Sequence, residues 1–153
     1  MSNINIGDPQ FDSHDVINKI ESLEGDLNDL RDGLETLLGD LNDAVEEERI
    51  DELEHINSEV RNHEEQIEDL EEELRPWQEM ADEFEGYGDW DHGEAIIHED
   101  AFTEYAENLA RDIYDIKDHW PYNHINWDAA AHELLADYGE VTVDGETYYM
   151  RST

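Results

Sequence analysis

Apolar residues recur at helical spacing through the first third of the chain. They stand alternately four and three residues apart, at Val16, Ile20, Leu23, Leu27, Leu30, Leu34, Leu37, Leu41 and Ala44. This alternation predicts a helix with a heptad seam that packs against another helix. Gly25, Gly33 and Gly39 lie within the segment, and each lowers helicity by roughly 1 kcal/mol relative to alanine. The helix therefore needs a partner to hold it together, and Ser13 is placed to cap its start.

A second seam follows, in which His63 fills one gap. Its apolar positions are Leu53, Ile56, Val60, Ile67, Leu70, Leu74, Trp77, Ala81 and Phe84. The two seams differ in register by two residues, whereas a coiled-coil stutter or stammer shifts the pattern by four or three. We therefore predict a chain break between about Val45 and Ile50 and a helical hairpin of residues 14–45 and 50–84. Because no glycine or proline lies in that interval, a long bent helix in a parallel dimer is the alternative.

Two residues of the second seam call for an interpretation. His63 is polar at a seam position, which is typical of a residue that sets the register of a coiled coil rather than of a pH sensor. Pro76 cannot donate a backbone hydrogen bond and clashes with the preceding turn. The helix is therefore expected to kink at Pro76, or to stop and restart there.

The last third of the chain predicts a small ααββ module. One helix is expected over residues 100–116, with a single apolar face formed by Phe102, Tyr105, Ala106, Leu109, Ile113 and Ile116. Pro121 lies in the loop that follows, Asn126 is placed to cap a second helix, and Gly139 is placed to end that helix as a C′ glycine. Asp144-Gly145 between alternating residues predicts a β-hairpin.

The expected fold is thus mainly α, an acidic coiled-coil helical hairpin followed by a small α+β module. Residues 1–13 are predicted to be a flexible arm, 14–84 the acidic coiled coil, 85–99 a linker and 100–153 the ααββ module. We interpret the four tryptophans as core anchors rather than as a binding cage. They are Trp77, Trp90, Trp120 and Trp127.

Charge sets the functional expectation. The chain has 45 acidic and 8 basic residues, a net charge of −37, so basic surfaces are expected partners and nucleic acid is not. Residues 43–75 carry 15 carboxylates and three arginines. As a helix they span roughly 50 Å, with one carboxylate about every 3.3 Å, close to the ~3.4 Å between charges on one DNA strand. Two paired helices would approach the density of the duplex.

We therefore predict a carboxylate ladder that stands in for phosphates and binds the basic DNA-binding cleft of a host protein. Its members are Glu46, Glu47, Asp51, Glu54, Glu64, Glu65, Glu68, Asp69, Glu71 and Glu72. The two leucine-rich seams also predict a homodimer, because pairing two helices within one chain need not bury all of the apolar surface of the seams.

Residues 106–151 resemble the closing part of the ArdA antirestriction proteins and of small phage proteins that share it. The resemblance is carried by Leu109 to Asp112, the entry from Ile125 to Asp128, Ala130 to Asp137 with Tyr138, and Asp144 to Arg151. It implies an acidic, elongated, dimeric inhibitor from a phage or mobile element that imitates DNA and occupies a type I restriction-modification enzyme. ArdA proteins resemble strings of small domains, whereas residues 14–84 here predict coiled coil. The target can therefore be a different DNA-handling defence complex.

Other kinds of site find little support. The chain has no cysteine, which excludes disulfides and thiolate metal sites. The segment from Asp89 to Asp100 fails as a calcium loop because Gly93 falls at position five rather than six. No HExxH, GxSxG, P-loop or dinucleotide fingerprint is present, so no enzyme, cofactor or metal is expected. No signal peptide or apolar run of ~20 residues is visible, and we expect a cytoplasmic protein.

Two other functions remain open. Acidity combined with only two lysines is also typical of a structural coiled-coil protein from a salt-adapted organism or its virus. Alternatively, the protein is an adaptor that recruits a partner through the aromatic residues of the ααββ module.

Overall fold

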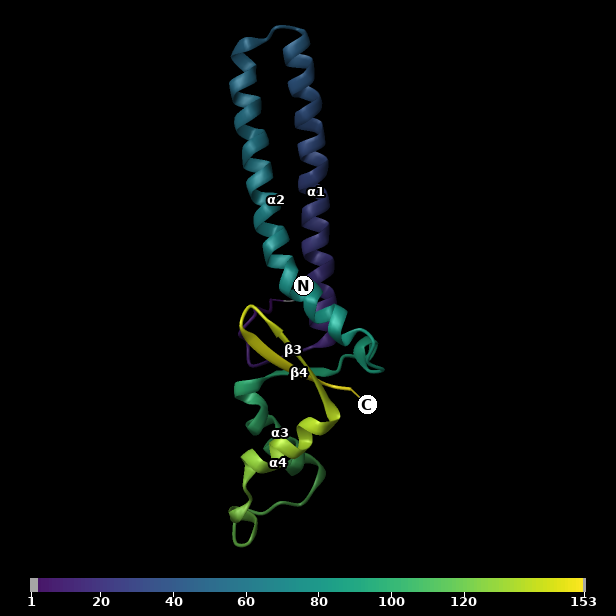
Figure 1. Ribbon diagram of the computed structural model, residues 1–153, viewed down its shortest axis with the longest axis vertical. Coiled ribbons are helices and arrows are strands. Elements are labelled where there is room, and N and C mark those ends of the chain that lie inside the picture. Colours follow the sequence, from purple (N-terminus) through teal and green to yellow (C-terminus); the bar gives the residue numbers. More distant parts are fainter. Residues whose placement is uncertain (1–2, 153) are drawn as a thin grey trace. The chain divides into compact units, whose positions relative to one another are not determined.

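A computed structural model describes residues 3–152 (Figure 1). The helices and strands are β1 (Gln10–Asp12), α1 (Ser13–Glu46), α2 (Ile50–Phe84), β2 (Ala95–His98), α3 (Phe102–Ile113), α4 (Trp127–Leu134), β3 (Tyr138–Val143) and β4 (Glu146–Arg151). Two long helices followed by a small α+β module confirm the expected fold class. The chain divides into two compact units. Ile20–Trp77 form the hairpin unit, and the chain up to Lys19 joins the chain from Gln78 in the terminal unit.

The hairpin unit turns where the mismatch of the seams predicts it. Helix α1 ends at Glu46 and α2 begins at Ile50. Glu48 has a left-handed φ of 56°, and the Arg49 N–H donates to the Ala44 carbonyl at 2.9 Å. This is the hydrogen bond of a Schellman motif, whose left-handed residue is usually glycine. Glu48 therefore takes the position where glycine is usual, so the sequence carried no glycine to indicate the turn. The alternative of one continuous bent helix is excluded.

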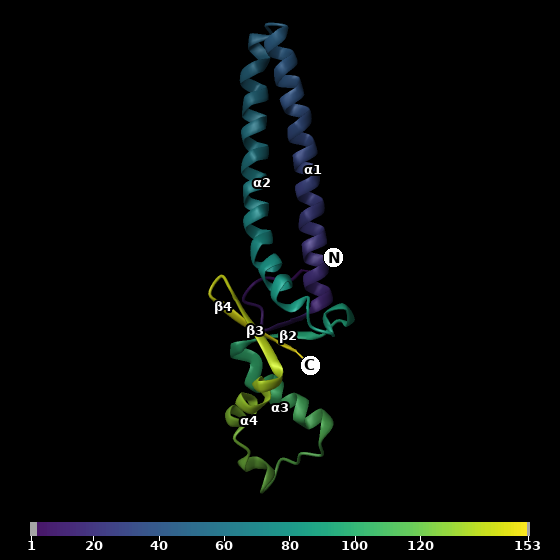
Figure 2. The ribbon, with the colours of Figure 1, turned by 45° about the vertical axis from the view of Figure 1, so that its right-hand side comes forward.

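The seams meet inside the hairpin unit. Figures 1 and 2 show α1 and α2 running side by side in opposite directions. Ala44, Ile56 and Val60 form a buried cluster. Partly buried residues that pack against it are Leu34, Leu37, Leu41 and Leu53. All seam positions of this unit are buried or half-buried, whereas Leu38 and Val45, which lie off the seam, are exposed.

His63 is half-buried at its seam position and explains one of the glycines. Its Nδ1 lies 3.1 Å from the Glu59 carbonyl oxygen. A Cβ added at Gly33 would lie 3.0 Å from its Nε2, whereas nothing lies within 4 Å of a Cβ at Gly25 or Gly39. Gly33 therefore leaves space for the imidazole ring, whereas no neighbouring group requires a glycine at the other two positions.

These environments predict unequal effects of alanine. Gly25→Ala and Gly39→Ala should each stabilise the hairpin unit by about 1 kcal/mol, the difference in helix propensity. Gly33→Ala should gain less or nothing, because the histidine ring must shift to admit the methyl group. Urea denaturation of the three variants, followed by circular dichroism, measures this. Equal stabilisation by all three would contradict the packing of His63 against Gly33.

Helix α2 continues through Pro76, so the expected stop and restart does not occur. The φ of proline is compatible with a helix, and the loss is one hydrogen bond to the carbonyl four residues earlier. Pro76 and Trp77 are buried, and Met80 and Phe84 are fully buried in the terminal unit. Burial on both sides of the proline offsets that loss.

The terminal unit holds a four-stranded antiparallel sheet in the order β1-β2-β4-β3. This corrects the expected ααββ module, because β1 lies in the predicted arm and β2 in the predicted linker. Ile96 and Ile97 of β2 are fully buried. Strands of three and four residues are too short to show an alternating pattern, and the glycines around them indicated a linker.

Helices cover both faces of this sheet. Ile97 packs with Phe102, Ala106 and Ala131 of α3 and α4. On the other face Phe11 contacts Tyr148, with 4.9 Å between ring centroids. The first turns of α1 and the last turns of α2 lie on the same side of the sheet as Phe11 and Tyr148 (Figures 1 and 2).

Residues near the N-terminus are held by specific contacts, so the predicted flexible arm is also corrected. The Tyr148 hydroxyl donates to the Asp8 carbonyl and accepts from the Gly7 N–H, both at 2.8 Å. Burial raises the pKa of Tyr148 to about 12. Asp12 and Asp15 each accept the other's backbone N–H, at 2.9 and 3.1 Å. This reciprocal cap replaces the one expected from Ser13, whose hydroxyl instead accepts from the Glu94 N–H at 3.0 Å.

The structure of the last third of the chain agrees in part with the predictions made from the sequence. Asn126 caps α4 by accepting from the Ala129 N–H at 3.1 Å. Asp144 and Gly145 form the turn of the β3–β4 hairpin with φ values of 51° and 80°. Helix α3, however, ends at Ile113, which is exposed.

Gly139 is not a helix cap, because it lies in β3. A Cβ at this position would stand 2.6 Å from Cζ and 2.8 Å from Cε2 of Tyr87. The residue is therefore small because the Tyr87 ring lies against the strand. Sequence signals for the end of a helix cannot indicate such a contact.

Candidate interaction surface

All ten residues of the carboxylate ladder are exposed. Glu46 ends α1, Glu47 lies in the turn, and the other eight project from α2. Their exposure follows from the seams, because the apolar positions face the partner helix and leave the remaining positions of each heptad to water. The structure thus brings the ladder together on one unit, along α2 and around the tip of the hairpin.

The antiparallel pairing sets the density of charge. The hairpin unit carries 22 carboxylates and four arginines, a net charge of −18. Its arm in α1, residues 20–46, is about 41 Å long at ~1.5 Å per residue. The unit therefore presents roughly one carboxylate per 1.9 Å of its length, against one phosphate per ~1.7 Å of duplex axis. The turn at Glu48 is what doubles the density of a single helix.

Two arginines of the hairpin unit, Arg31 and Arg49, make surface ion pairs. Arg31 Nη2 lies 3.3 Å from Glu71 Oε1, which joins α1 to α2. At the tip, Arg49 lies 3.0 Å from Glu47 and 2.7 Å from Glu52. Exposed pairs of this kind contribute only ~0.2–1 kcal/mol each, so a strongly basic partner can displace them.

The terminal unit exposes aromatic side chains beyond the end of α3. Tyr114 is 67% exposed and Trp120 is 73% exposed. The core role expected for Trp120 is therefore wrong, whereas Trp77 and Trp90 are buried and Trp127 is half-buried. The sequence pattern failed because Trp120 stands in a loop, where no period indicates which side chains face inward.

Arg111 holds this loop in place. Its Nε donates to Glu107 at 3.0 Å and its Nη1 donates to Asp118 at 3.1 Å. The hydrogen bond to Glu107 raises the pKa of Arg111. Its guanidinium carbon also lies 5.9 Å from the centroid of the Trp127 ring. The exposed aromatic residues are thus presented by a loop tied to α3 and α4.

Within residues 3–152, no cluster of three or more histidine, aspartate or glutamate side chains has a geometry that could hold a metal ion. No helix in that range is both long and apolar enough to cross a membrane.

Comparison with protein-family models, curated proteins and solved structures finds no match to this chain.

Proposed function

We propose that this protein is a DNA mimic that inhibits a DNA-binding defence enzyme of a host cell by occupying its basic cleft. The observation that supports the proposal best is the spacing of roughly 1.9 Å per carboxylate along the hairpin unit, close to that of phosphates along a duplex. The ladder supplies the contacts, and no catalytic step is involved. The resemblance of residues 106–151 to ArdA proteins suggests a type I restriction-modification enzyme as the first target to test.

Inhibition should be competitive with DNA. The experiment is cleavage of unmodified plasmid by a purified type I restriction enzyme while this protein is titrated in, repeated with increasing non-cleavable duplex. We expect the duplex to shift the inhibition curve to higher protein concentration. Affinity should also fall with salt, though less steeply than for DNA, because a protein lacks the condensed counterions of the duplex. A complex that survives saturating duplex would contradict the proposal.

Salt adaptation is the main rival explanation of the charge, and it predicts a different folding behaviour. The Debye length is ~10 Å at 0.1 M salt and about 3 Å at 1 M, so a protein built for molar salt should unfold when the salt is removed. A mimic must be folded at ordinary ionic strength. We expect equal helical circular dichroism at 50 mM and 2 M salt. Helical signal present only at 2 M salt would contradict the proposed inhibitory function.

A second candidate function is an adaptor that recruits its partner through the terminal unit. The exposure of Tyr114 and Trp120 favours it, because tyrosine and tryptophan are enriched among the residues that dominate binding energy at interfaces. It predicts that Trp120→Ala abolishes capture of the partner while neutralisation of the ladder does not. The homodimer and the host cytoplasm stay predictions of the sequence.

A further inference from the structure

The two flanks of the hairpin unit differ in chemistry near its turn. In the heptads of both seams a and d are the apolar positions, so Arg31 and Glu71 are both e positions. Their ion pair at 3.3 Å shows that the e positions of α1 and α2 border the same side of the seam, which we call the e flank. From Arg31 to Glu71 the e flank consists of Arg31, Leu38 and Val45 on α1 and of Ile50, Asn57, Glu64 and Glu71 on α2.

The e flank is apolar where α1 turns into α2. Leu38, Val45 and Ile50 are 45%, 58% and 73% exposed, and they are the exposed large apolar side chains of residues 20–77. We call these three residues the apolar patch. Positions e and g of a coiled coil are usually charged, and the g positions of the other flank follow this rule over the same stretch, with Asp40, Glu52 and Glu59. Exposed apolar residues gathered at one end of one flank indicate an interaction surface.

The surroundings of the apolar patch are acidic. One heptad from the Arg31–Glu71 pair, Leu38 stands opposite Glu64, so this exposed carboxylate faces an apolar residue rather than an arginine. Glu35 and Glu54, at b positions beside the e flank, are also exposed. A second copy of the chain would bring together two hairpin units that each carry a net charge of −18. Charge complementarity therefore favours a cationic partner for this surface.

We propose that the apolar patch binds a basic amphipathic helix of a partner protein, which packs along the e flank as a third helix. Leu38 and Val45 lie two turns apart, ~10 Å along the axis of α1. Apolar residues at i and i+7 of the partner helix have the same spacing and lie on one face. Lysine or arginine beside that face then lies near Glu35, Glu54 and Glu64. Recognition of this kind uses apolar anchors at i, i+3, i+4 and i+7.

The probe is the acetylated, amidated tetradecapeptide Lys-Leu-Lys-Lys-Leu-Leu-Lys-Lys-Leu-Lys-Lys-Leu-Leu-Lys, which carries leucines at that spacing. It is titrated into the ¹⁵N-labelled full chain in ~0.15 M salt, and we expect the amide shifts to centre on residues 34–57. Changing Leu38, Val45 and Ile50 together to glutamine should weaken binding about a hundredfold, because three apolar side chains are no longer buried against the peptide. Circular dichroism should be unchanged, because all three side chains are exposed in the free protein.

The matched control changes three residues of the other flank, Asp40→Asn, Glu52→Gln and Glu59→Gln. The flanks are separated by about the 10 Å diameter of a helix, more than the Debye length of ~8 Å at this salt concentration. We therefore expect the control to weaken binding less than about threefold. General attraction of a cationic peptide to an acidic protein predicts the reverse, with a larger effect of the control than of the glutamine variant.

A second peptide of the same composition, with leucine at alternating positions, cannot present its leucines on one face of a helix. It should bind at least about tenfold more weakly than the probe, because its leucines cannot cover the apolar patch together. Equal affinity of the two peptides, or a larger effect of the control variant than of the glutamine variant, would overturn the proposal.

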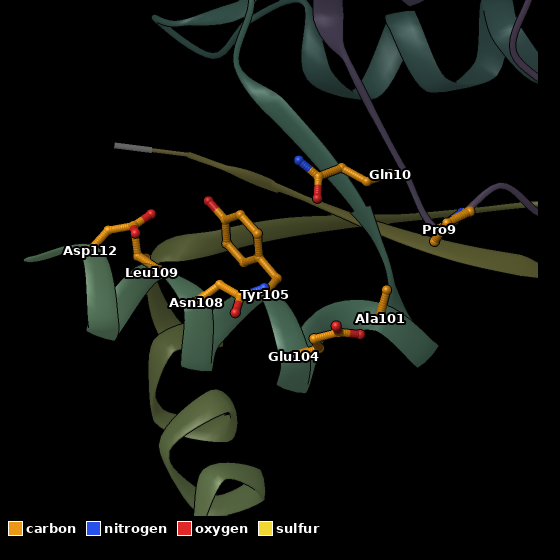
Figure 3. A pocket seen from close by; sticks show the side chains of 8 residues that line it. All are labelled: Pro9, Gln10, Ala101, Glu104, Tyr105, Asn108, Leu109 and Asp112. Carbon is orange, nitrogen blue, oxygen red and sulfur yellow. The ribbon is translucent and has the colours of Figure 1, made fainter. Parts of the chain in front are cut away.

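Two other occupants or sites are distinguished by the same samples. The terminal unit has a groove between Pro9 and α3, where Figure 3 shows the Tyr105 ring standing up from the helix near Leu109. Shifts centred on residues 101–112 would assign the peptide to this groove and overturn the proposal. Light scattering that gives twice the 17.9 kDa chain mass, and the single mass for the glutamine variant, would assign the apolar patch to a second copy instead. No DNA-binding enzyme is present, so none of these outcomes depends on the inhibitory role of the hairpin unit.

Discussion

Neutralising six ladder residues together is expected to lower inhibition several-hundredfold. The variant changes Glu64, Glu65, Glu68, Asp69, Glu71 and Glu72 to the corresponding amides. Each exposed ion pair with the target contributes ~0.2–1 kcal/mol, so six contribute about 3–4 kcal/mol near the middle of that range, and every ~1.4 kcal/mol is tenfold in affinity. A single Glu→Gln change should cost less than about fivefold. The measurement is the concentration for half-inhibition of DNA cleavage.

The matched control removes six charges from the terminal unit, so both variants have a net charge of −31. Its changes to amides are at Asp82, Glu83, Glu85, Asp128, Glu133 and Glu140, all exposed. We expect it to inhibit like the wild type, because the proposal assigns binding to the hairpin unit and not to net charge. Circular dichroism should show both variants folded. If the ladder variant still inhibits, the acidic surface only maintains solubility and the terminal unit carries the function.

Gly139→Ala is expected to destabilise the terminal unit by about 1–3 kcal/mol, the usual cost of overpacking. The added methyl group would overlap the ring of Tyr87, with Cζ and Cε2 at 2.6 and 2.8 Å. In a Tyr87→Ala background the same change should cost much less, so the double-mutant cycle should show a coupling of 0.5–3 kcal/mol. Urea denaturation followed by the fluorescence of the buried Trp90 measures all four proteins.

Gly88→Ala is the control, because nothing lies within 4 Å of a Cβ at that position. It should change stability only slightly. The cycle also separates the strand from the helix cap that the sequence indicated for Gly139. A C′ glycine adopts a left-handed conformation, so alanine would destabilise equally with or without the Tyr87 ring. Absence of coupling would therefore contradict the packing described for β3.

Two features of the hairpin unit were determined by the sequence alone. The seam positions from Ile20 to Ala44 and from Leu53 to Trp77 are buried or half-buried as their spacing predicts. The two-residue mismatch between the seams located the turn. Both succeed because heptad packing is a local, periodic rule that repeats over many turns of helix. The exposure of the ladder follows from the same rule, since positions off the seam have no partner to cover them.

The tertiary structure alone decided the four-stranded sheet. Asp12, the last residue of β1, pairs with Ala95, the first residue of β2, and 82 residues lie between them in the sequence. No local pattern could therefore pair these strands. Gly139 is small because of Tyr87, and Trp120 is exposed in a loop that Arg111 contacts at Asp118. These properties depend on contacts between residues distant in sequence. Periodicity reports which face of an element is apolar, but the partner that covers that face is chosen only when the chain folds.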